Sequence, residues 1–326
     1  MEERKLYPIK FCTLQDDYSW GSEEFKLADL GYRDSLVREG WLAGNSLGEL
    51  MDTYMDRISG DNSYEYYGRQ FPTCVRLLKV RGKMPLRVHP DDDTAGQRYD
   101  FLGKDKLWYV LRTGKDARVG IGMKQSTDAE TFFKACLDAS VDGLLNIVAP
   151  HAGQSLRIRP GTVHYAEGDI DILEIAQSSP MDFCLCPWGR PMEDGEFDPS
   201  LTLADALDFI DYRRFSYTPP EGDTLADCEA FTITRMKLDS PVKCNNSGYG
   251  SFILYSCIKG AASLQLDILG QTAAFPVREG ETMLVPAECE DFVIVPTEKD
   301  TVLLETTSDR IQPDSYTGDR SGSSTE

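Results

Sequence analysis

The chain has only three histidines, and two of them lie where ligand sites commonly form. His89 is found in LRVHPDD and His164 in PGTVHYAEG, each at the end of a predicted strand and beside a turn. Imidazole groups at such strand ends bind metal ions or move protons, and barrel mouths are common places for ligand sites. The alternative at either position is a hydrogen-bonded structural histidine. His151, in a predicted loop, is assigned no role.

A carboxyl group inside an apolar strand is the second chemical feature. Glu174 lies within DILEIA. A buried carboxyl group has a raised pKa unless nearby cations hold it ionised, which makes Glu174 the best single candidate for an acid or base. The alternative is a salt-bridged carboxylate at the mouth of a barrel.

The composition limits the partners that such a site can have. The 326 residues include 34 Lys and Arg against 54 Asp and Glu, for a net charge of -20. Such a field repels phosphate backbones and anionic lipids, so we expect no nucleic-acid and no membrane partner. The start of the chain lacks a signal-like apolar run, and nine scattered cysteines without a CxxC pair fit reduced thiols. A cytoplasmic protein is therefore expected.

Three segments have helical spacing. Residues 45–59 place apolar side chains on one face, residues 126–139 begin with Ser126 or Thr127 as N-cap, and residues 200–214 end in arginines. The acidic run 91–93 is expected to cap a further helix.

The remaining sequence predicts a mainly β protein with helical insertions. Short extended runs are separated by Gly, Pro, Asn and Asp turns. Residues 151–165 and 279–292 look like weak copies of each other, so we expect two stacked β-barrels. The tail, residues 311–326, is polar and is expected to be disordered. The extended runs are TCVRLLKVR, LWYVLRT, QSLRIR, DILEIAQ, FTITRMKL, SFILYSCIKG, ASLQLDIL, TMLVPA, DFVIVPT and TVLLETT.

Four motifs in order resemble the class I mannose-6-phosphate isomerases, which are metal-dependent sugar-phosphate isomerases of the cupin superfamily. The resemblance implies two cupin (jelly-roll) barrels: an N-terminal domain, residues 1–221, with helical insertions and the site, and a C-terminal structural domain, residues 222–310. The motifs are FPTCVRLLKVRGKMPLRVHPDDD, GKDKLWYVL, PGTVHYAEGDIDILEIAQSS and PWGR.

The resemblance also implies a set of site residues, and several of them depart from the family pattern. The family holds its metal with Gln, His, Glu and His, which fall here at Arg87, His89, Lys106 and His164, and its catalytic Arg falls at Cys184. Glu174 matches the family. The residues expected to bind substrate are Lys104, Trp108, Gln177, Arg190 and Trp20. For the two tryptophans the alternative is core packing, and for Lys104 it is a surface position.

Two cations at ligand positions argue against a divalent metal. Arg87 lies two residues before His89 on a strand, so both side chains share a face. At an effective dielectric near 20, a divalent ion about 4.5 Å from one cation meets roughly 7 kcal/mol of repulsion. Two neutral imidazoles do not offset this, because structural zinc normally has more ligands, none of them positive. A one-residue slip would bring Asp105 in place of Lys106 and rescue the site, but it would also turn the strand over.

Two hypotheses follow. The first is a mannose-6-phosphate isomerase-like protein that binds a sugar phosphate or related carbohydrate in a pocket kept cationic by Arg87 and Lys106, with no metal cofactor. The second is an active aldose-ketose isomerase with zinc in an altered site or with a metal-free mechanism, in which Glu174 or His89 moves the proton and the two cations stabilise the enediolate. A third reading remains open, in which both cations pair with Glu174 and nearby Asp residues and fill a dead cavity.

Overall fold

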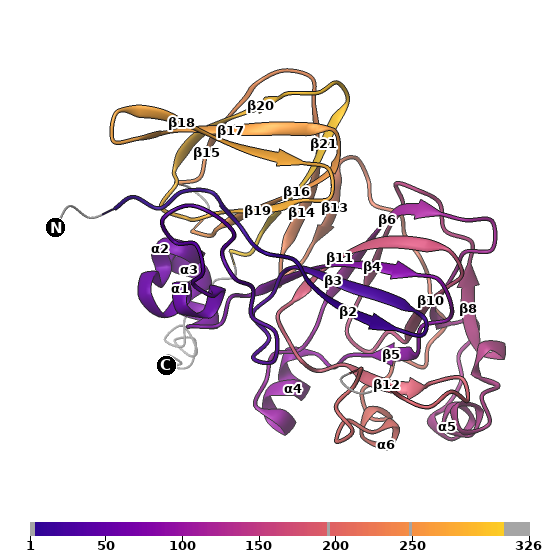
Figure 1. The fold of residues 1–326 in the computed structure, drawn as a ribbon. Helices are drawn as coiled ribbons and strands as arrows, with labels where there is room; N and C mark the ends of the chain where they lie inside the picture. The colour runs from indigo at the N-terminus through magenta and orange to yellow at the C-terminus, as the bar shows by residue number, and fades with distance from the viewer. Residues whose placement is uncertain (1–3, 194–195, 248–249, 310–326) are drawn as a thin grey trace, which may run out of the picture.

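The computed structural model describes residues 4–193, 196–247 and 250–309. Antiparallel strands form four sheets, grouped into two stacked pairs, and short helices lie at the periphery (Figure 1). This confirms the predicted mainly β fold with helical insertions. The tail predicted to be disordered, residues 311–326, lies outside the described residues.

The first pair of sheets, which we call the N-terminal sandwich, holds the candidate site. Its inner faces pack apolar side chains such as Val80, Val110, Ile121 and Phe183 against one another. The six-stranded sheet has the order β2 (Leu14–Tyr18), β3 (Gly21–Leu27), β4 (Thr73–Val80), β11 (Ile170–Gln177), β6 (Lys106–Thr113), β9 (Ser155–Ile158). The five-stranded sheet has the order β12 (Phe183–Cys186), β5 (Leu86–Val88), β10 (His164–Glu167), β7 (Arg118–Met123), β8 (Leu145–Val148).

The second pair, the C-terminal sandwich, has its own apolar interior, which includes Leu264, Ile294 and Leu303. Its six-stranded sheet takes its edge strand β1 from the start of the chain, so the two ends of the sequence share one sheet. That sheet has the order β1 (Ile9–Lys10), β19 (Thr282–Val285), β16 (Ile253–Lys259), β21 (Thr301–Thr307), β14 (Thr232–Leu238), β13 (Thr224–Asp227). The facing sheet has the order β15 (Val242–Asn245), β20 (Asp291–Pro296), β17 (Ala261–Ile268), β18 (Gln271–Arg278). The predicted division of the chain at residues 221 and 222 stays a prediction.

A third apolar core joins the two sandwiches. It combines the outer face of the first six-stranded sheet, at Val75 and Ile175, with the facing strands of the C-terminal sandwich, at Ile233 and Leu254. Helices α1 (Leu47–Tyr54), α2 (Asp56–Ser59) and α3 (Asp61–Tyr67) stand beside this core (Figure 1). Because the core is continuous and apolar, it fixes the two sandwiches against each other.

The predicted helices are present but shorter than their patterns. The helix expected over residues 45–59 divides at Met55, which has φ 50°. The second helix, α5 (Ala129–Leu137), is capped by Asp128, whose side chain accepts the amide of Thr131, and not by Ser126 or Thr127 as expected. The third, α6 (Leu203–Ala206), is a single turn, so its expected C-terminal arginines lie outside it. A 3₁₀ turn, η1, spans Val141–Gly143.

Asp91 caps α4 (Asp92–Tyr99) as predicted, because its carboxylate accepts the Thr94 amide.

The two segments interpreted as weak copies also share one layout. In each, a strand of a six-stranded sheet (β9 or β19) leads through a Pro-containing turn to a strand of the facing sheet (β10 or β20). None of the helices within the described ranges combines the length and apolar character that a membrane span requires.

Candidate functional site

Glu174 is the centre of a buried charged cluster at one end of the N-terminal sandwich. On β11 it lies directly between Arg76 of β4 and Trp108 of β6 in the strand register. Its Oε1 accepts from Arg76 Nε at 2.8 Å, and its Oε2 accepts from Lys106 Nζ at 3.0 Å and from Trp108 Nε1 at 2.7 Å. Only 1% of Glu174 is exposed. Both carboxylate oxygens are therefore engaged by buried donors.

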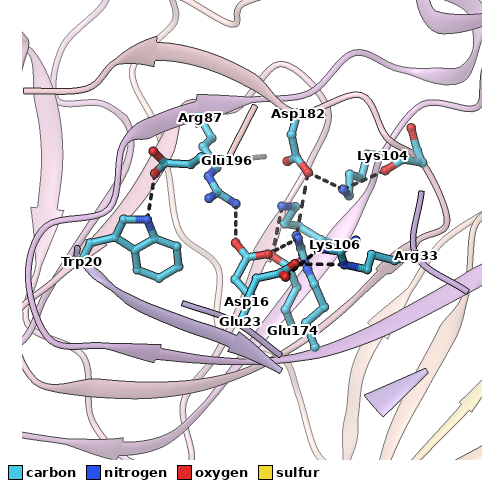
Figure 2. Close-up of polar contacts among 12 residues, drawn as sticks. Asp16, Trp20, Glu23, Arg33, Arg87, Lys104, Lys106, Glu174, Asp182 and Glu196 are labelled. Carbon is cyan, nitrogen blue, oxygen red and sulfur yellow. Dashed lines mark hydrogen bonds and ion pairs between the residues drawn. The ribbon is translucent and has the colours of Figure 1, made fainter. Parts of the chain in front are cut away.

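Glu23 of β3 links this arrangement to the facing sheet. Its two oxygens accept from Arg76 Nη1 at 2.8 Å and from Arg87 Nη1 at 3.0 Å (Figure 2). Arg87 lies on β5, so one carboxylate bridges the two sheets. Close by, Asp182 accepts from Lys104 Nζ at 2.8 Å just before β12 begins. We call these seven residues the charged cluster: Glu23, Arg76, Arg87, Lys104, Lys106, Glu174 and Asp182.

The charged cluster is less cationic than the sequence suggested. Four cations face three carboxylates, which gives a net charge of only +1, because Glu23, Glu174 and Asp182 offset most of the positive charge. Burial opposes ionisation of Glu174, but the charges of Arg76 and Lys106 outweigh it and hold the pKa of Glu174 well below its usual range. Burial lowers the pKa of Lys106 to about 8, against the attraction of Glu174. Arg76 and Lys106 together thus hold Glu174 ionised.

The two site histidines meet beside this cluster. Their ring centroids are 5.0 Å apart, and each Nδ1 hydrogen-bonds a backbone carbonyl at 2.9 Å, that of Met181 for His89 and that of Thr162 for His164. Neither Nε2 has a hydrogen-bond partner among the described residues. Burial and then the charge of Lys106 lower the pKa of His89 well below its usual range and that of His164 to about 3. Both imidazoles are neutral at physiological pH.

The residues present do not fit the divalent metal that the resemblance implies. The two unpartnered imidazole nitrogens could act as metal ligands. The other two ligand positions, however, hold Lys106, bonded to Glu174, and Arg87, bonded to Glu23. Asp105, the expected rescue, pairs instead with Arg157 at 2.6 Å. Across the described ranges, no three His, Cys, Asp or Glu side chains are grouped to hold a metal ion.

The other predicted residues divide between the cluster and its surroundings. Trp20 and Trp108 are 1% and 0% exposed, so both belong to the core. Lys104 is buried and not at the surface. Arg190 lies outside the charged cluster and donates to Glu196. Glu196 also accepts from Trp20 Nε1 at 2.8 Å. The structure does not bring Gln177 to the site: its amide contacts Asp105 and Asp92 in a separate cavity.

Sequence reasoning missed Arg76, Glu23, Asp182 and Glu196. The sequence did contain a signal for Arg76, which interrupts the apolar strand TCVRLLKV. A charged side chain in such a strand must be paired. The partner itself was hidden, since Glu174 lies 98 residues further along the chain.

A cavity of about 320 Å³ opens beside the charged cluster. Arg76 and Arg87 form part of its wall, and Tyr32 and Phe197 contribute aromatic rings. The complete lining is Asp16, Tyr18, Glu23, Phe25, Tyr32, Arg76, Arg87, Pro180, Asp182, Glu196, Phe197 and Asp198. A concave polar site with aromatic rings suits a small polar ligand.

Paired jelly-roll sheets with a polar site at the mouth of one pair define a cupin-type protein, and solved structures confirm this fold. The chain superposes on mannose 6-phosphate isomerase from Bacillus subtilis with a TM-score of 0.79 at 20% identity, covering 92% of this chain and 99% of that one. A putative mannosephosphate isomerase from Archaeoglobus fulgidus gives a TM-score of 0.74 at 18% identity, covering 94% and 99%.

The sequence is similar to curated proteins of the same kind. Mannose-6-phosphate isomerase ManA of Bacillus subtilis is 25% identical over 315 residues, which is 87% of this chain and 95% of the relative. The probable mannose-6-phosphate isomerase GmuF of Bacillus subtilis is 25% identical over 269 residues, 80% and 82% of the two chains. No protein-family model matches the sequence. With the four motifs in order, the chain thus resembles the class I mannose-6-phosphate isomerases over most of its length.

Proposed function

We propose that this chain is a mannose-6-phosphate isomerase-like protein that binds a sugar phosphate or related carbohydrate and does not carry out metal-dependent isomerisation. One observation carries the proposal: the ammonium group of Lys106 lies 3.0 Å from the Glu174 carboxylate, inside the buried cluster, at a position where the family pattern has a carboxylate ligand. A cytoplasmic location is part of the proposal and rests on the sequence alone.

The chemistry of the isomerisation supports this choice over the active-enzyme alternative. Proton transfer between C1 and C2 needs a base with a free lone pair near the operating pH, and the developing enediolate needs an unengaged cation. Glu174 is fully engaged by Arg76, Lys106 and Trp108. Against the effect of burial, the charges of Arg76 and Lys106 hold its pKa well below the usual range. Arg87, the cation proposed for the enediolate, is engaged by Glu23.

The cavity supports a binding role and argues against a wholly dead site. Arg87 both belongs to the charged cluster and lines the cavity, so the cluster borders an open concave surface that a ligand can reach.

The test is metal content and turnover in the wild type and in the double variant Arg87→Gln, Lys106→Glu. The substitutions change the cluster charge by -3, and a bound zinc ion, with its charge of +2, restores most of this loss. We expect purified wild type to lack stoichiometric zinc and to leave mannose 6-phosphate unchanged, and the double variant to take up zinc, measured by elemental analysis.

The matched control is Arg213→Gln, Lys237→Glu, which makes the same charge change at side chains that are 86% and 63% exposed. This control should take up no zinc. Near-stoichiometric zinc in wild type, or zinc uptake by the control, would overturn the proposal. Turnover of mannose 6-phosphate by metal-free wild type would select the metal-free isomerase instead.

A further inference from the structure

We propose that the cavity beside the charged cluster takes an uncharged monosaccharide in preference to a sugar phosphate. This inference rests on the proposed function, because it assumes that the site binds a carbohydrate, and it narrows the ligand to one chemical class. The argument comes from the charges that line the cavity and from the partners that already engage them.

Carboxylates outnumber cations on the described wall of the cavity. Two arginines face five carboxylates there, and Arg33, Lys104 and Arg190 behind the wall balance the other three, so the cavity offers no net positive charge. A phosphate ester is a dianion near neutral pH, so it would enter without a balancing positive charge. An uncharged sugar needs none. The five carboxylates are those of Asp16, Glu23, Asp182, Glu196 and Asp198.

Both arginines of the wall are already paired with carboxylates. Arg76 donates to both Glu174 and Glu23, and Arg87 donates to Glu23. Both guanidinium groups are buried. Moving either to a phosphate would leave a buried carboxylate without its cation, which is strongly unfavourable.

The cations behind the wall are engaged in the same way. Arg33 pairs with Asp16 at 2.6 Å and Lys104 with Asp182 at 2.8 Å (Figure 2). Arg190 pairs with Glu196. The cavity is therefore surrounded by completed ion pairs, in contrast to phosphate sites, which present arginine or lysine donors to the ligand.

What the cavity does offer suits sugar hydroxyl groups and a sugar ring. The carboxylate oxygens of the wall accept hydrogen bonds from hydroxyl groups. Tyr32 is 51% exposed and Phe197 lies over the Arg87 guanidinium, 5.0 Å from it, so aromatic faces are at hand for the apolar face of a pyranose. A volume of about 320 Å³ lies at the small end of ligand sites, which suits a single sugar unit.

Isothermal titration of the full chain tests the preference, with mannose, mannose 6-phosphate, fructose and fructose 6-phosphate as probes. We expect at least one free sugar to bind about tenfold more tightly than its phosphate ester. A phosphate ester that binds as tightly as its sugar overturns this inference and leaves the proposed function standing. If none of the four probes binds at tens of millimolar, both fall.

Two exposed wall residues sharpen the test. Tyr32→Ala should weaken binding of the free sugar about fivefold by removing an aromatic face. Asp198→Asn should shift the affinity ratio toward the phosphate ester by about threefold, because it removes one screened negative charge from the wall. Asp239→Asn, the same change at an exposed residue outside the cavity, should leave both affinities unchanged. A ratio that ignores Asp198 would contradict the electrostatic argument.

Discussion

The two sandwiches share an architecture and apolar cores but differ in the charge that they bury. The C-terminal sandwich is filled by apolar side chains, and its partly buried Glu305 accepts a hydrogen bond from the Tyr255 hydroxyl at 2.7 Å. Burial raises the pKa of Glu305, which favours its neutral form. The N-terminal sandwich instead buries four cations and three carboxylates at its mouth.

This difference separates what the fold needs from what the site needs. Charges in a low-dielectric interior are costly unless each is paired, and apolar packing serves a fold at least as well. Because the C-terminal sandwich closes its core without such charges, the fold itself does not require them. The charged cluster is therefore not a requirement of the fold, which supports the proposal that a ligand binds at the N-terminal mouth.

The largest effect is expected from removing the shared cation of the cluster. Arg76→Met leaves Glu23 and Glu174 buried with one cation fewer, so it should lower the free energy of unfolding by about 3–5 kcal/mol. Urea denaturation at neutral pH measures this loss.

The matched change in the other sandwich is Glu305→Gln. The amide keeps an acceptor for Tyr255, and burial already favours the neutral form of the carboxyl group, so the loss should stay below about 1 kcal/mol. Equal losses in the two variants would refute the contrast between the interiors.

The sequence predicted the strands and the fold class better than it predicted the site. Alternating and apolar runs between turns are local signals, and each of them became a strand. Helix ends depended on single side chains: Asp128 caps α5 because its carboxylate reaches the Thr131 amide, a choice that Ser126 and Thr127 also offered.

The sequence revealed only part of the site, because the ion pairs that build it join residues far apart in the chain. Family resemblance pointed to Lys106 and Glu174, which do meet, and to Gln177, which lies elsewhere. The bridge from Glu23 to Arg76 and Arg87 depends on the register of β3 against β4 and on the approach of the facing sheet. No pattern within one strand encodes that geometry.

A second, smaller contrast concerns the response to pH. The pKa of His164 is about 3 in the folded chain, below the ordinary value of 6.5, because of burial and then Lys106. Stability from this histidine is complete above pH 6.5 and is lost as the pH falls, by about 1.4 kcal/mol per pH unit below about pH 6. His164→Gln should remove that slope, measured as urea midpoints from pH 7 to pH 4.

His151→Gln is the control, because His151 is exposed and should leave the slope unchanged. Glu305 acts with the opposite sign. Burial raises its folded-state pKa, so its contribution falls as the pH rises above the unfolded value, and Glu305→Gln should remove that fall. A wild-type stability profile that stays flat below pH 6 would show that the imidazoles are not held neutral.

The smallest contrast compares one hydroxyl in each sandwich. Tyr255→Phe takes the donor from Glu305 in an otherwise apolar interior, and should cost about 1–1.5 kcal/mol in urea denaturation. Tyr165→Phe takes a donor from Asp142, whose other oxygen pairs with Lys83 and whose side chain is 41% exposed, so water replaces the lost bond and the cost should stay below about 0.5 kcal/mol. The reverse order would mean that solvent access does not decide what a lost hydrogen bond costs in this fold.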